Sequence, residues 1–198
     1  MAVDEALLWA SKTTVLRFYG WQRPSLSFGY FGRAAEAVAE GPERELVRRW
    51  TGGGIVLHGA DLTYSIIVPH FPGRIFPSPQ QLYEAVHGAI REALDDPEAA
   101  LAGSAAPKVS EACFANAVAA DVMVGERKIA GAAQRRTRAG LLHQGSIQYG
   151  KLPLDFEVRL AGLLCPHFQA ASIKPEVLES AKALATRKYG STAWLYRR

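Results

Sequence analysis

The sequence predicts an α+β fold in which a mixed sheet of hairpin-linked strands is flanked by helices. Short stretches rich in β-branched and aromatic residues follow one another across brief turns, as the strands of a hairpin do. Stretches with apolar residues at helical spacing do not alternate regularly with these strands, which argues against a doubly wound fold. A length of 198 residues suits one substantial core, so we expect residues 1–198 to form a single domain.

The first third of the chain is expected to begin with a helix and continue mainly as strands. Val3, Leu7 and Ala10 share one side of a helix, which predicts that residues 2–10 are helical. The segments predicted to follow are strands at 14–21 and 25–29, a short helix at 34–39, and strands at 55–58 and 63–68. A turn at Gly59-Ala60-Asp61 joins the last two strands.

The clearest helix of the chain is predicted at residues 80–94. Leu82, Val86 and Ile90 lie along one stripe, and Ser78-Pro79 supplies a cap and a proline in the first turn. Residues 95–108, rich in Ala, Pro and Gly, are expected to form a mobile loop. The predicted segments beyond this loop are strands at 120–124, 127–134 and 141–148, and helices at 154–164 and 175–188.

Composition indicates a globular cytoplasmic protein. Hydrophobic residues make up 48% and charged residues 21%, which is not the balance of a disordered chain. Two acids, Asp4 and Glu5, stand where a secretory signal would be basic, and no apolar run approaches the roughly 20 residues that span a bilayer. Only Cys113 and Cys165 are available to pair, which argues against a disulfide scaffold but leaves one bridge open.

The net charge of +4 is modest, and much of it lies in residues 127–138. It can attract an acidic protein partner or a bound nucleotide equally well. No recognised nucleic-acid-binding module is present, so nucleic acid is not the expected partner.

The first segment that suggests chemistry is Arg-Arg-Trp-Thr-Gly-Gly-Gly-Ile-Val-Leu-His at residues 48–58. Adjacent glycines cost backbone entropy, but they allow positive φ values and a close approach of the backbone to a ligand. Their N–H groups can converge on an oxyanion or a phosphate. The spacing is neither that of a P-loop nor that of a dinucleotide-binding loop, and a plain flexible turn is the alternative interpretation.

The second segment contains Lys128, which precedes a row of small residues at 129–133. Such a row leaves room for a ligand along a strand, and a lysine ammonium beside it can stabilise charge on an acyl carbonyl oxygen or a phosphate. The alternative is an exposed hairpin with solvated cations around the turn at Gly125-Glu126.

The third segment is Leu-Leu-His-Gln-Gly-Ser-Ile at residues 141–147. His143 followed closely by Gly145 can line the same groove as Lys128. A purely structural histidine is the alternative interpretation of this motif.

Together the three segments resemble the catalytic domain shared by lipoate–protein ligases, biotin–protein ligases and octanoyltransferases. Residues 48–58 look like the substrate-binding signature of that family, 128–134 like its catalytic-lysine signature, and 143–147 like the strand that follows. The opening residues 4–8 and 16–21 are also similar to the family's first helix and strand. The resemblance implies the biotin/lipoate protein ligase-like, class II synthetase-like fold, and makes Lys128 the invariant lysine. The accessory C-terminal domain of many ligases is not expected, nor is the edge strand that usually precedes the first helix.

The family uses two ways to activate the acyl group. Ligases form an acyl-adenylate from ATP with Mg, whereas octanoyltransferases take the acyl group from a carrier thioester, usually onto their own cysteine. The setting of Cys113 resembles the cysteine loop of one octanoyltransferase branch, and nearby cations can lower a thiol pKa. A small buried hydrophobic role is the equal alternative for Cys113. Cys165 lies roughly where another branch carries its nucleophile, in a poorly matching context.

Some departures from the family patterns favour a transferase, and another favours a ligase. Gly59 follows His58 where ligases usually carry aspartate, and Ala120 precedes Asp121 where they tend to carry asparagine. The uninterrupted glycine triplet, in contrast, is more typical of ligases than of the transferase branch.

The predicted function is therefore transfer of an octanoyl or lipoyl group to a lysine of a lipoyl-domain or glycine-cleavage H-type carrier protein. Lys128 and Cys113 are the expected catalytic residues, with an acyl carrier protein or lipoate as the source of the acyl group. The expected substrate-binding residues are Arg48, Arg49, Gly52, Gly53, Gly54, His58, Gly131, Ala132, His143 and Gly145. No metal or cofactor is expected for transfer. An ATP-dependent lipoate ligase and a non-catalytic acyl-binding protein are the alternatives.

Overall fold

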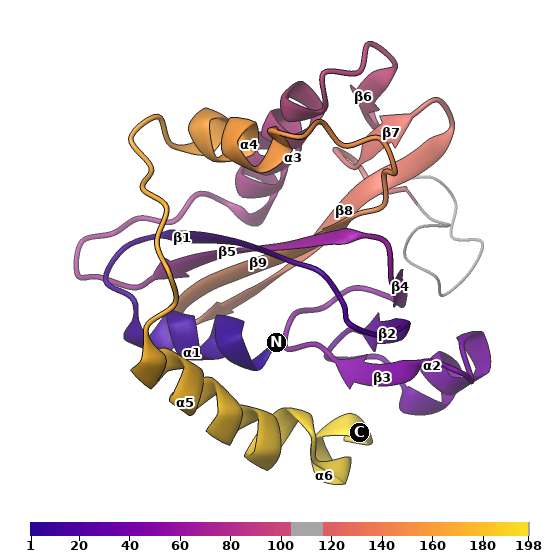
Figure 1. Cartoon of the computed structure of the whole chain (residues 1–198), viewed down its shortest axis with the longest axis vertical. Helices are drawn as coiled ribbons and strands as arrows, with labels where there is room; N and C mark the ends of the chain where they lie inside the picture. Colours follow the sequence, from indigo (N-terminus) through magenta and orange to yellow (C-terminus); the bar gives the residue numbers. More distant parts are fainter. Residues whose placement is uncertain (104–116, 198) are drawn as a thin grey trace.

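A six-stranded antiparallel sheet forms the centre of the molecule (Figure 1). The computed structural model describes residues 1–103 and 117–197. In spatial order the strands are β1 (Val15–Tyr19), β5 (Leu62–Pro69), β9 (Gly140–Ile147), β8 (Arg127–Thr137), β7 (Val122–Val124) and β6 (Ala99–Leu101). The two long central strands β8 and β9 form a hairpin, so the segments containing Lys128 and His143 are neighbours.

A second, three-stranded sheet lies beside the first and carries the glycine segment at its edge. It consists of β3 (Glu45–Arg48), β2 (Ser25–Phe28) and β4 (Val56–His58), in that order. β2 and β3 are parallel and are connected through α2 (Ala34–Glu40), whereas β2 and β4 are antiparallel. The glycine triplet connects β3 to β4.

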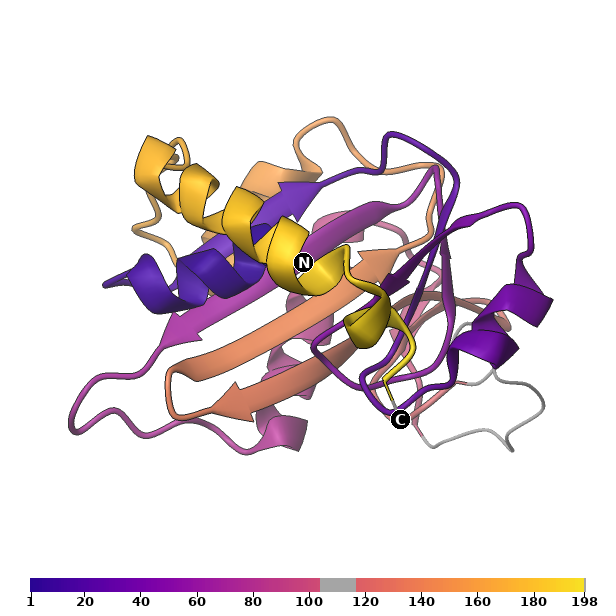
Figure 2. The same cartoon turned by 90° about the horizontal axis from the view of Figure 1, so that it is seen from below.

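Helices cover both faces of the main sheet (Figures 1 and 2). α3 (Pro79–Leu94) and α4 (Phe156–Leu164) pack on one face, and α1 (Ala2–Ala10) and α5 (Pro175–Leu184) pack on the other. α5 continues as a π-helix, η2 (Ala185–Tyr189), and then α6 (Thr192–Leu195) reaches β3 of the small sheet. This arrangement confirms the predicted α+β class. The main sheet is antiparallel, and the parallel pair of strands, β2 and β3, belongs to the small sheet.

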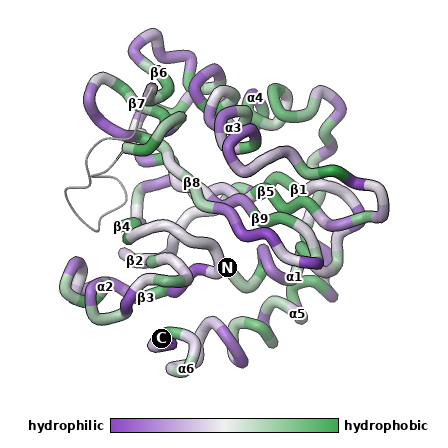
Figure 3. Tube along the Cα trace, turned by 180° about the vertical axis from the view of Figure 1, so that it is seen from behind, coloured by the Kyte–Doolittle hydropathy of each residue, from purple (hydrophilic) through white to green (hydrophobic). Residues whose placement is uncertain are grey.

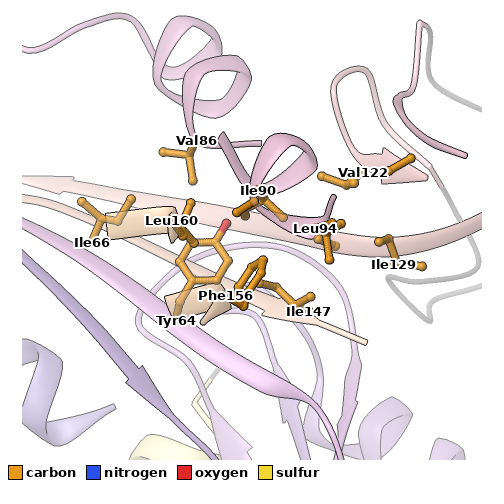
Figure 4. Close-up of a cluster of buried hydrophobic side chains, with 13 residues drawn as sticks. Tyr64, Ile66, Val86, Ile90, Leu94, Val122, Ile129, Ile147, Phe156 and Leu160 are labelled. Atoms are coloured by element: carbon orange, nitrogen blue, oxygen red, sulfur yellow. The ribbon is translucent and has the colours of Figure 1, made fainter. Parts of the chain in front are cut away.

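The helix α3 shows why the local sequence folds as it does. The Ser78 hydroxyl accepts from the backbone N–H of Gln81, and the Gln81 side chain accepts from the N–H of Ser78, which completes a capping box. Hydrophilic and hydrophobic residues alternate along α3 and α5 at helical spacing (Figure 3). The apolar stripe of α3 buries Val86 and Ile90 against Tyr64 and Ile129 of the sheet (Figure 4).

The remaining sequence predictions for helices and strands match within a few residues, except that β3, β6 and α6 are not predicted. β3 has only four residues, with a charged residue at each end, Glu45 exposed and Arg48 buried, so it shows no strand pattern. Residues 99–101 form β6 within the expected loop at 95–108, and the part of that loop from 104 onward lies outside the described residues. Among the described residues, no helix is both long and apolar enough to cross a membrane.

Candidate functional site

A pocket lies where the small sheet meets β8 and β9 of the main sheet, with about 450 Å³ of empty space when the part open to solvent is included. It receives side chains or backbone from strands that are far apart in the sequence. The lining residues are Met1, Tyr19, Ser27, Arg49, Gly53, Val56, His58, Thr63, Lys128, Gly131, Ala132, Ala133, Gln144, Gly145 and Ser146. All three sequence segments singled out for chemistry therefore contribute to one pocket.

The β8–β9 hairpin forms one wall of the pocket, and its small residues are required by their neighbours. Gly131 pairs with Ser146 and Ala132 with Gly145 across the hairpin. A Cβ atom on Gly131 would lie 2.5 Å from Cε of Lys128, and one on Gly145 would lie 2.4 Å from the ring of Tyr64. Both distances are too short for real contacts, so glycine is required at both positions, at Gly131 by the side chain of Lys128 and at Gly145 by the buried ring of Tyr64.

Lys128 is held at this wall by a buried carboxylate. Its Nζ lies 2.8 Å from Oδ2 of Asp121, and the side chains of the pair are 4% and 0% exposed. The hydroxyl of Tyr83 donates to the other carboxylate oxygen of Asp121, and the backbone N–H of Val118 donates to Oδ2. Asp121 is thereby fixed in position, and it keeps the ammonium group at the pocket wall, where the ammonium can bind a carbonyl oxygen or an oxyanion.

The glycine triplet is shaped by Arg49. The Arg49 guanidinium donates to the carbonyl oxygens of Gly52 and Gly54 at 3.0 and 2.7 Å, and to Oγ of Ser27 at 2.8 Å. Gly53 has a φ of 85°, in the region that favours glycine. The triplet also passes so close to Gly29 that a Cβ there would lie 2.0 Å from the carbonyl oxygen of Gly53. The sequence therefore needs glycine on both sides of this contact.

His58 stands between a serine and an aspartate. Its Nε2 lies 2.6 Å from Oγ of Ser27, and its Nδ1 lies 2.8 Å from Oδ2 of Asp61. The indole of Trp21 stacks on the imidazole with ring centres 4.1 Å apart. Burial lowers the pKa of His58, although the hydrogen bond and charge of Asp61 raise it.

Asp61, in the turn that follows His58, accepts three hydrogen bonds in addition to the one from His58. Thr63 and Ser146 donate to Oδ2, and the backbone N–H of Gly59 donates to Oδ1. Burial raises the pKa of Asp61, but the hydrogen bond and charge of His58, with the bonds from Ser146 and Gly59, outweigh it and lower the pKa to about 2. Asp61 is thus an anion at neutral pH, and it anchors His58.

Two of the expected substrate-binding residues lie elsewhere. Arg48 points away from the pocket and donates to four carbonyl oxygens, those of Tyr30, Gly32, Leu195 and Arg197. Its role is to hold the C-terminal segment against the small sheet. Adjacent residues along an extended chain point to opposite sides, so only one of the two arginines can face the pocket.

His143 also lies behind the sheet rather than in the pocket. It is fully buried on the α3 face, where its Nε2 is 3.2 Å from the hydroxyl of Tyr64. Alternation along β9 instead brings Gln144 and Ser146 to the pocket side. The predicted placement of Arg48 and His143 in the site is therefore corrected.

The other predicted residues divide into three groups. Arg49, Gly53, His58, Lys128, Gly131, Ala132 and Gly145 line the pocket. Gly52 and Gly54 do not line the pocket but accept hydrogen bonds from Arg49, which does, and Cys113 lies outside the described residues. Cys165 is exposed at the end of α4 and does not line the pocket. In the described ranges, no group of three or more His, Cys, Asp or Glu side chains is suited to hold a metal ion.

Sequence reasoning missed Ser27, Thr63 and Ser146. Each lies in a strand that was predicted, and each is a small polar residue among apolar ones. Without knowledge of which strands pair, nothing in the sequence shows that these three hydroxyls meet near His58.

Comparisons with known proteins agree with this architecture. Protein Ta0514 from T. acidophilum, solved with bound lipoic acid, superimposes with a TM-score of 0.75 at 21% identity, covering 98% of this chain and 91% of that one. A lipoate-protein ligase A bound with ATP superimposes with a TM-score of 0.71 at 22% identity, covering 98% of this chain and 92% of that one. At this level of identity the likeness establishes the fold.

Relatives with similar sequences identify the family more closely than the fold does. Octanoyltransferase LipM of Symbiobacterium thermophilum is 34% identical over 176 residues, which cover 81% of this chain. Octanoyltransferase LipM of Kyrpidia tusciae is 38% identical over 186 residues, which cover 84% of this chain. The matched regions span 62% and 66% of the lengths of these relatives. The model of the lipoyl protein ligase A/B catalytic domain matches residues 1–153, and the chain therefore belongs to that family.

Proposed function

We propose that this protein transfers an octanoyl or lipoyl group to a lysine of a lipoyl-type carrier domain. The observation that carries the proposal is the position of Lys128: Asp121 holds its ammonium at a pocket wall made of Gly131, Ala132 and Gly145. An aliphatic chain can approach such a wall closely because its residues have no side chain larger than a methyl group. The similarity to octanoyltransferases supports an octanoyl donor.

The chemistry of the pocket suits an acyl group entering as a thioester. The carbonyl oxygen binds near Lys128, and the ammonium stabilises the negative charge that develops on this oxygen when a nucleophile attacks the carbonyl carbon. The glycine triplet lies across the pocket from this wall and supplies backbone that the substrate can approach closely. Arg49 keeps the triplet in place, so the shape of the pocket does not depend on the substrate.

Cys113 is the proposed transient acceptor of the acyl group. Its thiolate would attack the thioester of an octanoyl carrier protein and form a new thioester, and the carrier lysine would then displace the cysteine to give an amide. The carrier would be a lipoyl domain or a glycine-cleavage H-type protein. This route uses the energy of the donor thioester and requires no metal or nucleotide.

A lipoate ligase is the second candidate, favoured by the unbroken glycine triplet. That reaction would use ATP and Mg to form lipoyl-AMP before the same lysine attacks. The amide-forming step is common to both routes.

Intact mass spectrometry of the purified protein tests the proposal. Incubation with octanoyl carrier protein should add one octanoyl group to the wild type and none to Cys113→Ser, with Cys165→Ser as the matched control that is still labelled. Labelling of Cys113→Ser would remove Cys113 from the mechanism. Pyrophosphate release that depends on lipoate would establish the ligase instead, and binding of octanoate or lipoyl-AMP without any turnover would contradict both.

A further inference from the structure

A buried hydrogen-bonded row of side chains lies at the pocket that contains Lys128, and apart from Arg49 it is not used by the mechanism above. The row runs from Arg49 through Ser27 and His58 to Asp61. All four residues are less than 9% exposed, and three of them, Ser27, Arg49 and His58, line the same pocket as Lys128.

The direction of the hydrogen bonds follows from the charges at the two ends. Asp61 is an anion and can only accept, so Nδ1 of His58 carries the proton and donates it. Nε2 of the neutral imidazole is then an acceptor, and the hydroxyl of Ser27 donates to it at 2.6 Å. The guanidinium of Arg49 donates to Oγ of Ser27, which leaves the serine proton directed to His58.

If this row served only to hold the glycine triplet in place, it would not need a histidine. In this row Arg49 is the residue that donates to the triplet, while His58 is fixed by Asp61, by the stacked Trp21 and by Arg44, which donates to the His58 carbonyl oxygen. The charged or titratable groups that face His58 are Asp61, Arg49 and Arg44. Of these, the Asp61 anion holds the imidazole tautomer whose Nε2 lone pair accepts the hydroxyl proton of Ser27, which lines the pocket.

We propose that Ser27, His58 and Asp61 form a proton relay for the amide-forming step, in which Ser27 and His58 accept the proton that the attacking carrier lysine must lose. This inference rests on the proposed function, and because both activation routes end in the same amide, it does not depend on which route supplies the acyl group.

When the acyl group is a thioester, the neutral amine nitrogen forms a bond to the acyl carbon, and the carbon–sulfur bond breaks. One proton of the amine passes to Oγ of Ser27 while the serine proton passes to Nε2 of His58, and the imidazolium then protonates the leaving thiolate. The products are an amide, a free thiol and the relay in its original state. Asp61 acts as a positioning residue, since its carboxylate accepts from His58, Gly59, Thr63 and Ser146 and is not among the described groups that line the pocket.

A single-turnover assay tests the relay. It measures the transfer of an octanoyl group, already loaded on the enzyme, to a lipoyl-domain carrier. The wild-type rate should rise with pH as His58 loses its proton, with a midpoint below the ordinary histidine pKa of about 6.5. His58→Gln should load normally, transfer about 10²-fold more slowly and lose this pH dependence. Ser27→Ala should show a smaller loss, since water can take the place of the hydroxyl.

Two further variants separate the relay from a structural role. Added imidazole should restore transfer to His58→Ala, and Asp61→Asn should shift the pH midpoint downward because the charge that raises the pKa of His58 is gone. Ser25→Ala is the matched control. Ser25 is buried on the same strand and pairs with His58 in the sheet, but its hydroxyl donates to the carbonyl oxygen of Arg23 and it does not line the pocket.

The outcomes distinguish the two proposals. Loading and transfer by the wild type, together with an unchanged pH profile in His58→Gln and no rescue by imidazole, would overturn the relay and leave the acyltransferase intact. A wild-type enzyme that forms no amide on the carrier lysine, either from octanoyl carrier protein or from lipoate with ATP and Mg, would overturn both.

Discussion

The ammonium of Lys128 lies 2.8 Å from the carboxylate of Asp121, and both groups are almost completely buried. Two charges in such a place must compensate each other, because an isolated buried charge is costly. The pair sits at a pocket wall rather than in the core: Lys128 lines the pocket, while Asp121 is fully enclosed. Stability and activity are therefore linked at this pair.

Lys128→Met should separate these two roles. The change removes the cation, so transfer should fall by about 10²–10³-fold, and it leaves Asp121 unpaired, which should destabilise the fold by about 3–5 kcal/mol. The double variant Lys128→Met/Asp121→Asn should recover part of the stability and none of the activity. Urea unfolding and the octanoyl-transfer assay measure the two effects, and an active single variant would contradict the proposed role of Lys128.

Gly131→Ala should reduce activity with little effect on stability. The new Cβ would meet Cε and Nζ of Lys128 at 2.5 and 2.8 Å, which is the movable end of a long side chain. The ammonium should shift, so transfer should fall while the melting temperature changes by only a few degrees. Gly150→Ala, where a Cβ meets nothing within 4 Å, is the control.

Gly145→Ala should show the opposite pattern. Its Cβ would lie 2.4–2.5 Å from ring and hydroxyl atoms of Tyr64, which is fully buried and cannot move away. Overpacking of this kind costs about 1–3 kcal/mol or more, so the main effect should be a lower midpoint of urea unfolding. Equal unfolding midpoints for Gly145→Ala and Gly150→Ala would contradict this.

The sequence was sufficient to predict α3 and the strands β8 and β9, because apolar periodicity, β-forming residues and capping residues are local signals. It also predicted that the glycine triplet and Lys128 belong together, through the resemblance of three ordered motifs. It did not distinguish Arg48 from Arg49, or His143 from Gln144, since which of two neighbours faces the pocket depends on strand pairing that no local pattern reveals. For the same reason, no local pattern in the sequence shows that Ser27, His58 and Asp61 are hydrogen-bonded in one row.

The difference between the two arginines can be measured directly. Arg48→Lys should lower the melting temperature, because one ammonium cannot satisfy the four carbonyl oxygens that the guanidinium reaches, and each buried polar group left unsatisfied costs about 1–3 kcal/mol. Transfer at temperatures well below melting should be nearly normal. Arg49→Lys should reduce transfer more than it reduces stability, because the glycine triplet loses its two bonds. The reverse ranking in both assays would contradict the assignment.

Two buried histidines behind Lys128 should make the fold sensitive to acid. Burial lowers the pKa of His87 to about 4 and the pKa of His143 to about 3, and the rings lie 6.2 Å apart, so the charge of one opposes protonation of the other. Among the described residues, Nε2 of His87 and Nδ1 of His143 have no hydrogen-bond partner. Both rings are therefore neutral in the folded protein at pH 7.

The sign of the effect follows from the number of bound protons. Between about pH 4 and pH 6.5 the unfolded chain binds protons at both histidines and the folded chain does not, so the free energy of unfolding rises with pH. The stabilisation is complete above pH 6.5 and is lost as the pH falls toward 4, at roughly 1.4 kcal/mol per pH unit for each histidine. Urea unfolding of His143→Gln over this range should show a slope smaller by about one proton, whereas His167→Gln, at an exposed position, should keep the wild-type slope. If His143→Gln and the wild type lose stability in parallel, the neutral state of His143 is not what makes the fold acid-sensitive.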